Sequence, residues 1–241
     1  MLGRMKLVGE RRALAAAILA FYALVYAAFA ILGLVGPMSN ALYALAFSYG
    51  LAFFGLVAGY FWARWFAVGV ALFGVIQGAL GIWQVGTEPV VIFLAATHIF
   101  ATAALWGTAM AVPYDGQSAW REKFHMDDNA VQRLGRSVMR AGVSLPFILL
   151  YAFAPKPDAA SFVAAVGAML LATGGFRALV QLKTWGVLAL AGAGVVLASV
   201  AGVHAAEGWI SIPPIAASLL LFAATAPYAA PIVRSLSRRA V

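Results

Sequence analysis

The chain has 241 residues, of which 64% are hydrophobic and only 10% are charged, whereas soluble domains carry about 25% charged residues. So few charges cannot cover a water-facing surface, which excludes a soluble globular protein and predicts an all-α bundle of transmembrane helices. The formal net charge is +8. We attribute it to membrane topology and not to a nucleic-acid partner, because the basic residues gather in loops on one side of the membrane.

About eight apolar runs of membrane-spanning length follow one another along the chain. A transmembrane helix needs roughly 17 to 25 apolar residues, and turn residues such as Gly36-Pro37 and Gly86-Thr87 separate the runs. Basic residues precede the first run, which is long enough to span, so we expect it to be an uncleaved signal-anchor helix. The predicted spans are residues 13–35, 41–61, 66–85, 90–112, 141–154, 159–180, 185–206 and 210–233, of which the fifth must borrow residues upstream to cross.

The basic residues predict the orientation of these spans. With the amino terminus inside, fifteen of the 16 lysines and arginines fall in cytoplasmic segments, and only Lys156 falls outside. An asymmetry of this size follows the positive-inside rule. We therefore expect an integral protein of a bacterial or archaeal cytoplasmic membrane, with both termini in the cytoplasm.

The two halves of the predicted bundle resemble each other. Trp65 and Trp185 both begin the third span of a half, and Glu88 and Glu207 mark the outer turn before the fourth. A 4+4 repeat of this kind would have its pseudo-twofold axis along the membrane normal, although eight similar hydrophobic helices can also match by coincidence. The predicted organisation is an N-terminal four-helix half (1–112), a cytoplasmic basic amphipathic connector (113–140) and a C-terminal four-helix half (141–241).

The connector combines a helix cap with a basic stripe. Asp127 or Asp128 can cap a helix that begins near Asn129. One face of this helix carries arginines and another carries aliphatic residues, which suits anionic lipid headgroups or a partner subunit. The alternative is a solvated connector that only obeys the positive-inside rule. The predicted lipid or partner contacts are Trp120, Arg133, Arg136 and Arg140.

Glycines spaced four residues apart occur in two of the predicted spans, as Gly55 with Gly59 and as Gly74 with Gly78. Small residues at this spacing let helix backbones approach closely, so that dispersion contacts replace the missing hydrophobic drive. The same spacing also arises by chance in glycine-rich helices. We predict a tightly packed bundle from it, and no particular dimer interface.

Polar side chains inside the hydrocarbon region are the first functional candidates, since each costs free energy without a partner. The sequence places no charged residue near the centre of a span, and its best polar pair is Gln77 with His98. Both lie about ten residues from the turn at Thr87, which puts both about 15 Å below that turn, near the bilayer centre. The pair is either a binding point centred on His98 or a structural hydrogen bond between the third and fourth spans.

The sequence requires no cofactor and no metal. It contains no cysteine, which excludes thiolate catalysis, cysteine-ligated zinc and iron–sulfur clusters. A bis-histidine haem needs two imidazoles at matched depth, and His98, His125 and His204 offer no such pair. His204 and Glu207 can share a metal geometrically, but two such residues are also an ordinary interfacial pair. Whether a pigment, a quinone or a singly ligated haem binds stays open.

No nucleophile–base pair or carboxylate dyad can be assembled from the sequence, so we expect a protein that is not an enzyme. The first hypothesis is a non-catalytic subunit or scaffold that packs with membrane lipids, with other membrane proteins or with further copies of itself. The alternative is a transporter or channel for a small neutral or weakly polar solute, with Gln77 and His98 lining the path. Neither hypothesis includes a nucleic-acid partner.

Overall fold

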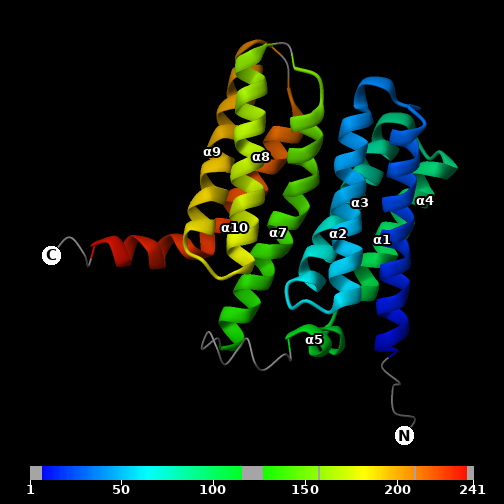
Figure 1. Ribbon diagram of the computed structural model, residues 1–241, viewed down its shortest axis with the longest axis horizontal. Coiled ribbons are helices and arrows are strands. Elements are labelled where there is room, and N and C mark those ends of the chain that lie inside the picture. The colour runs from blue at the N-terminus through cyan, green and yellow to red at the C-terminus, as the bar shows by residue number, and fades with distance from the viewer. Residues whose placement is uncertain (1–6, 116–126, 157, 209, 238–241) are drawn as a thin grey trace, which may run out of the picture.

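A computed structural model of the chain describes residues 7–115, 127–156, 158–208 and 210–237, and in these ranges the regular elements are all helices (Figure 1). The predicted all-α class is confirmed. The helices are α1 (Val8–Ile31), η1 (Gly36–Met38), α2 (Ser39–Ala58), α3 (Ala63–Val85), α4 (Pro89–Leu105), α5 (Thr108–Asp115), α7 (Asp128–Phe153), α8 (Ala159–Val180), α9 (Trp185–Ala206) and α10 (Ile212–Ser237).

Six of these helices are long and apolar enough to cross a membrane, namely α1, α2, α3, α8, α9 and α10. Helix α4 is equally apolar but has only 17 residues, and α7 carries its charges in its first half. The predicted polytopic helical bundle is therefore confirmed. The eight-span arrangement, which also requires α4 and α7 to cross, stays a prediction.

Successive long helices alternate in direction, so the connections gather at two opposite ends (Figure 1). One end holds five of these segments, which are the start of α1, the α2–α3 turn, α5, the start of α7 and the α8–α9 turn. We call it the arginine-rich end, because Arg11, Arg12, Arg64 and Arg133 lie on these elements. Lys156 lies at the opposite end, in the α7–α8 turn.

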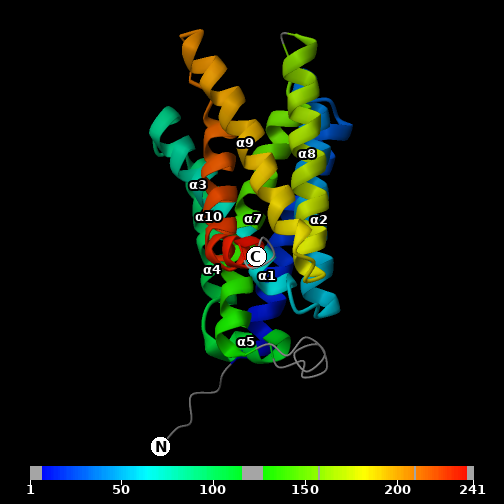
Figure 2. The same ribbon diagram turned by 90° about the vertical axis from the view of Figure 1, so that its left-hand side faces the viewer.

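Each half of the chain forms a ring of four helices. In the first ring α1 contacts α2, α2 contacts α3, α3 contacts α4, and α4 returns to α1; helices α7 to α10 repeat this pattern. The rings lie side by side, and in the view turned by 90° the second lies in front of the first (Figures 1 and 2). They meet mainly where α7 packs against α2 and α3. This interface is asymmetric, and the 4+4 repeat itself stays a prediction.

Glycines allow the close contact of α3 with α7, which we call the seam. A Cβ atom built on Gly69 would lie 2.5 Å from the carbonyl oxygen of Met139 and 2.9 Å from the carbonyl carbon of Gly142. Gly135 of α7 leaves room in the same way for the indole of Trp65. Because only glycine fits at such positions, the seam is held by backbone-to-backbone dispersion contacts.

The two glycine pairs seen in the sequence have different roles. Gly74 and Gly78 pack α3 against α4, since a Cβ atom on Gly78 would lie 2.7 Å from that of Ala95. Gly59 has φ +74° and ends α2 in the left-handed conformation, which glycine adopts most readily. The tight packing predicted from the spacing therefore holds for the pair on α3.

Helix α7 joins the end of the predicted connector to the predicted fifth span. It runs without a break for 26 residues from Asp128 to Phe153, so residues 128–140 belong to the same helix as the predicted fifth span. An apolar run over 141–154 is too short to cross alone, which explains the extension upstream. The predicted cap is confirmed, because the Asp127 carboxylate accepts a hydrogen bond of 2.6 Å from the backbone N–H of Ala130.

Candidate functional site

His98 is fully buried inside the first ring, among side chains of α1 and α2. Its Nε2 lies 2.8 Å from the Tyr49 hydroxyl, and its Nδ1 lies 2.7 Å from the carbonyl oxygen of Leu94, one turn earlier in α4. The ring of Tyr22 packs on the imidazole with a centroid distance of 4.2 Å. The Tyr22 hydroxyl lies 2.6 Å from Oγ1 of Thr97, so the hydroxyls of this cluster have partners inside the protein.

These bonds determine the tautomer of a neutral His98. A carbonyl oxygen can only accept, so Nδ1 carries the proton and donates to Leu94, while Nε2 accepts from the Tyr49 hydroxyl. Both ring nitrogens are therefore in use, and a ligand or metal could bind His98 only after one bond breaks. Gly74 of α3 provides the space for the ring, because any side chain there would overlap it. The geometry favours the structural interpretation of His98.

The predicted hydrogen bond between Gln77 and His98 is not formed, since both nitrogens of His98 have other partners. The distance of each residue from the turn at Thr87 predicts only its depth in the membrane. Each residue turns a helix by about 100°, so Gln77, three residues after Gly74, lies about 60° around α3 from the direction in which Gly74 faces α4. From this flank of α3 the Gln77 side chain lines a pocket between the two halves.

That pocket, which we call the outer pocket, has a volume of about 370 Å³ and lies at the end opposite the arginine-rich end. Its polar side chains come from α3, α7, the α7–α8 turn, α9 and the α9–α10 turn, as Gln77, Tyr151, Lys156, His204 and Ser211. The Lys156 ammonium donates to the carbonyls of Tyr151 and Ala154 and lies 4.0 Å from the Tyr151 ring centroid. Burial lowers the pKa of Lys156. This pocket offers more polar groups to a small solute than the surroundings of His98 do.

The seam is closed below the outer pocket. Phe73 of α3 and Phe147 of α7 meet edge to face with a centroid distance of 4.8 Å. They lie one helical turn closer to the arginine-rich end than Gln77 and Tyr151 do. The backbone contact at Gly69 follows one turn further on. These two layers separate the outer pocket from a second pocket on the same seam.

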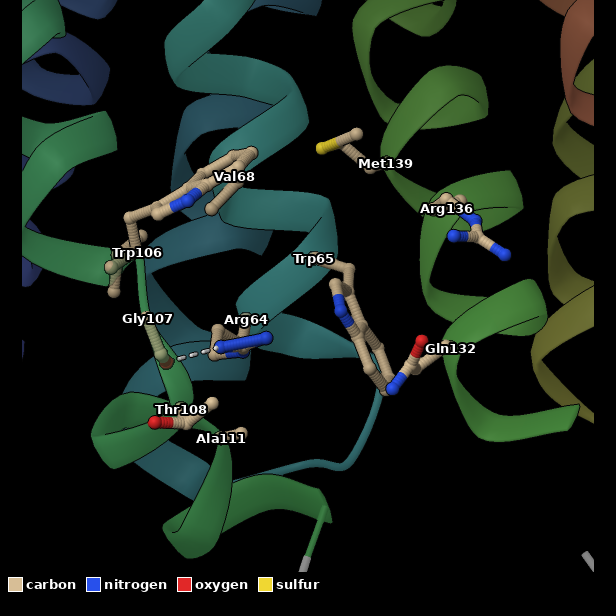
Figure 3. A pocket seen from close by; sticks show the side chains of 11 residues that line it. Arg64, Trp65, Val68, Trp106, Gly107, Thr108, Ala111, Gln132, Arg136 and Met139 are labelled. Carbon is tan, nitrogen blue, oxygen red and sulfur yellow. Dashed lines mark hydrogen bonds between the residues drawn. The ribbon is translucent and has the colours of Figure 1, made fainter. Parts of the chain in front are cut away.

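The second pocket, which we call the inner pocket, has a volume of about 330 Å³ and lies at the arginine-rich end (Figure 3). The Arg64 guanidinium forms part of its wall, donating to the Gly107 carbonyl at 3.3 Å and lying 5.5 Å from the Trp65 ring centroid. The polar and aromatic side chains that line it are Arg64, Trp65, Trp106, Thr108, Gln132 and Arg136.

Two further arginines at this end bind backbone carbonyls at helix ends. Arg12 donates to the Leu56 carbonyl at 2.6 Å, at the end of α2, and Arg11 donates to the Ala104 carbonyl at 3.0 Å, at the end of α4. The last carbonyls of a helix have no partner within it, and a cation is favoured at the negative end of the helix dipole. Residues that the sequence explained only by membrane orientation therefore also join α1 to α2 and α4.

Arg140 makes a contact within the protein that the sequence did not predict, and its predicted contact with lipid or a partner stays a prediction. Its Nη1 donates to the Ala223 carbonyl of α10 at 2.6 Å. Pro227 lies four residues further on and has no N–H, so that carbonyl lacks its helical donor. Arg133 and Arg136 are exposed, as lipid or partner contact requires, and their contacts stay a prediction. Trp120 lies outside the described residues.

His204 is buried near the end opposite the arginine-rich end and lines a groove of about 630 Å³ together with Asp158 and Glu207. Asp158 caps α8, accepting from the backbone N–H of Ser161 at 2.8 Å, and this bond lowers the pKa of Asp158, with the nearby His204 adding to the shift. In the part of the chain that the structure describes, no three His, Cys, Asp or Glu side chains are grouped to hold a metal ion.

Sequence reasoning missed Tyr22 and Tyr49 as the partners of His98. In sequence, the aromatic residues of the first two spans are more typical of core packing than of the alternative, contacts with a pigment or quinone. A usable signal existed, because a tyrosine hydroxyl at mid-membrane depth needs a polar partner, and His98 is one of few such groups in the sequence. Tyr151 was missed for the same reason.

Comparison of the chain with protein-family models, curated proteins and solved structures finds no match. The fold itself defines a class. The bundle exposes large apolar side chains on its outside, such as Leu24 at 71% and Val90 at 78% exposure, which lipid and not water would solvate. The chain is a multi-pass integral membrane protein of the helical-bundle type.

Proposed function

We propose that this chain is a non-catalytic membrane subunit or scaffold, which works by packing its helices with lipids and with other membrane proteins. The observation that carries this proposal is the state of His98, an imidazole that the sequence places near the middle of a span. Both of its nitrogens are bonded within the protein. A buried polar network with all members satisfied stabilises one helix arrangement and leaves no group ready for proton transfer or ligation.

The closed seam supports the same proposal. A scaffold needs a fixed arrangement of its halves, and the contacts at Gly69 and at Phe73–Phe147 hold α3 and α7 together at mid-depth. Closely packed interfaces of this kind have low compressibility and resist gradual deformation. We further propose that the arginine-rich end faces the cytoplasm, because basic residues are retained on that side.

The orientation can be tested on the full chain, which contains no cysteine, so that a single introduced cysteine reports one position. Ser39→Cys lies at the end opposite the arginine-rich end and should react with a membrane-impermeant maleimide from outside the cell. Arg177→Cys, in the last turn of α8, should react only after the membrane is opened. The reverse pattern would overturn the orientation.

The scaffold role is tested by native mass spectrometry of the full chain, extracted from its membrane in mild detergent. The expected result is a defined complex with another membrane protein or with further copies of the chain. In parallel, proteoliposomes should take up glycerol and urea no faster than protein-free liposomes. A chain that stays monomeric without a protein partner and speeds uptake would contradict the proposal.

A transporter for a small polar solute is the second candidate, and one observation favours it. Two pockets lie at opposite ends of the same seam, and a barrier of only a few residues separates them. Opening of that barrier from alternate sides would move a solute past Gln77. In this version of the transport hypothesis the path runs along α7 and does not pass His98.

Cysteine labelling separates the two candidates. Gln77→Cys lines the outer pocket and Met139→Cys lines the inner pocket. For a scaffold, each cysteine should react with the impermeant reagent from one side only. For a transporter, Gln77→Cys should react from both sides, and Gln77→Ala should abolish uptake that the unmodified chain supports.

A further inference from the structure

We propose that the inner pocket binds the phosphate headgroup of an anionic phospholipid, with the first carbons of the acyl chains on its apolar floor. The proposal does not depend on whether the chain is a scaffold or a transporter. It rests on the charge of the pocket, on the order of its lining residues with depth, and on the one arginine there that reaches no described acceptor.

The charge of the pocket favours an anion. Arg64 and Arg136 line it from α3 and α7, on either side of the Trp65 ring (Figure 3), and the lining residues include no acidic side chain. Thr108 and Gln132 add a hydroxyl and an amide, which can donate to phosphate oxygens. Arginine binds phosphate well, because its planar fork of donors matches the oxygens.

The lining changes from polar to apolar with depth. Helices α3 and α7 both run from the arginine-rich end toward the opposite end (Figure 1), so a higher residue number on either helix lies deeper. Val68 follows Arg64 by one helical turn, and Met139 follows Arg136 by nearly one. A pocket with cations at its mouth and aliphatic side chains behind them matches a phospholipid, whereas a soluble phosphate would gain nothing from the apolar part.

Arg136 separates this pocket from the other arginines of the same end. Arg11, Arg12 and Arg140 all donate to backbone carbonyls and so have structural partners. Arg136 is exposed and makes no hydrogen bond or ion pair with the residues whose placement is described. The bond from Arg64 to Gly107 holds the opposite wall in place. The structure thus offers one fixed and one adaptable cation to the same ligand.

The aromatic residues place the pocket at the membrane surface. Trp106 lines the pocket with 59% exposure, and Trp65 lines it with 9% exposure. Tryptophan concentrates at the depth of the lipid headgroups. A phosphate at this depth would lie where the headgroups of the surrounding leaflet already lie, so a lipid can enter from the membrane without leaving it.

The test uses the full chain purified in detergent and measures its unfolding temperature during lipid titration, since a ligand that binds only the folded state raises it. The probes are dioleoyl phosphatidylglycerol, phosphatidylcholine with the same acyl chains, and glycerol phosphate. Phosphatidylglycerol should stabilise the chain, phosphatidylcholine should do so less, and glycerol phosphate should have no effect. Equal stabilisation by glycerol phosphate would overturn the lipid assignment in favour of a soluble phosphate.

Two variants test the location. Arg136→Gln removes the adaptable cation and should weaken the apparent affinity for phosphatidylglycerol roughly tenfold, the worth of one charge-assisted hydrogen bond. Ala111→Phe keeps both arginines but fills the pocket and should abolish the stabilisation. The matched control is Arg177→Gln, which removes an exposed arginine at the same end and outside this pocket. Arg136 is exposed, so Arg136→Gln should leave folding intact. The proposal fails if this variant binds phosphatidylglycerol as tightly as Arg177→Gln does.

Discussion

The seam predicts that the smallest side chain is already too large at Gly69. The methyl carbon of an alanine would lie 2.5 Å from the Met139 carbonyl oxygen, whereas ordinary contact begins at 3.4 Å, so α7 would have to move by about 0.9 Å. Overpacking costs roughly 1–3 kcal/mol, and the upper end applies because the contacted atoms are backbone. Replacing glycine by alanine inside a helix gains about 1 kcal/mol from the higher helix propensity of alanine. The net loss of folding free energy is therefore about 2 kcal/mol. For a chain of this length that corresponds to roughly 4–8 °C in unfolding temperature.

The assay is a thermal ramp of the purified chain followed by tryptophan fluorescence, with Gly167→Ala as the matched control. Gly167 also lies inside a helix, but no atom lies within 4 Å of a Cβ atom built on it. The control should therefore unfold at the temperature of the parent chain or a few degrees higher. If Gly69→Ala unfolds together with the control, α3 and α7 do not approach each other as closely as described, and the seam cannot act as the barrier between the two pockets.

Arg140→Gln should lower stability by about 1–3 kcal/mol, because the Ala223 carbonyl loses its donor; the same thermal ramp measures this loss. In a Pro227→Ala background, the backbone N–H gained at position 227 can donate to the Ala223 carbonyl, so Arg140→Gln should cost less stability there. Equal losses of stability in both backgrounds would show that the Ala223 carbonyl does not depend on Arg140. Burial lowers the pKa of Lys156 below its usual 10.5. The unfolded chain therefore binds this proton more tightly, and stability should rise with pH toward that value. Lys156→Met should remove this rise of stability with pH. If the stability difference between the parent chain and Lys156→Met does not change with pH, the lowered pKa of Lys156 is contradicted.

The sequence predicts the helices well where polar residues mark their ends. The predicted spans 159–180 and 185–206 coincide with α8 and α9, because Asp158 caps one helix and a polar turn separates the two. Helix α1 begins earlier than predicted, at Val8. Its first turns carry Arg11 and Arg12, which lower hydropathy and yet favour helix. Hydropathy reports the part of a helix that lies in lipid, and not the whole helix.

The candidate site was harder to predict, for a geometric reason. The rise per residue gives the depth of Gln77 and His98, but the direction of each side chain depends on which helix occupies each side of the ring. That arrangement comes from packing at Gly74 and Gly69, and a single sequence does not encode it in any simple spacing. The carbonyl freed by Pro227 was a signal that could have been used, since proline in a helix always leaves the carbonyl four residues earlier without its donor.

The arginines show why orientation and stability cannot be read separately in this chain. Arg11, Arg12 and Arg140 belong to the basic residues that carry the predicted orientation, and they also bind carbonyls at helix ends or at a proline. Removing one of them changes the topology signal and the packing together. Arg136 and Arg177 are exposed and make no such bond in the described part of the chain, so their removal breaks no hydrogen bond within that part. Replacing this exposed pair should weaken the orientation signal and leave the unfolding temperature in lipid-free detergent nearly constant. Replacing Arg11 and Arg12 should lower the unfolding temperature even in a detergent micelle, where orientation has no meaning.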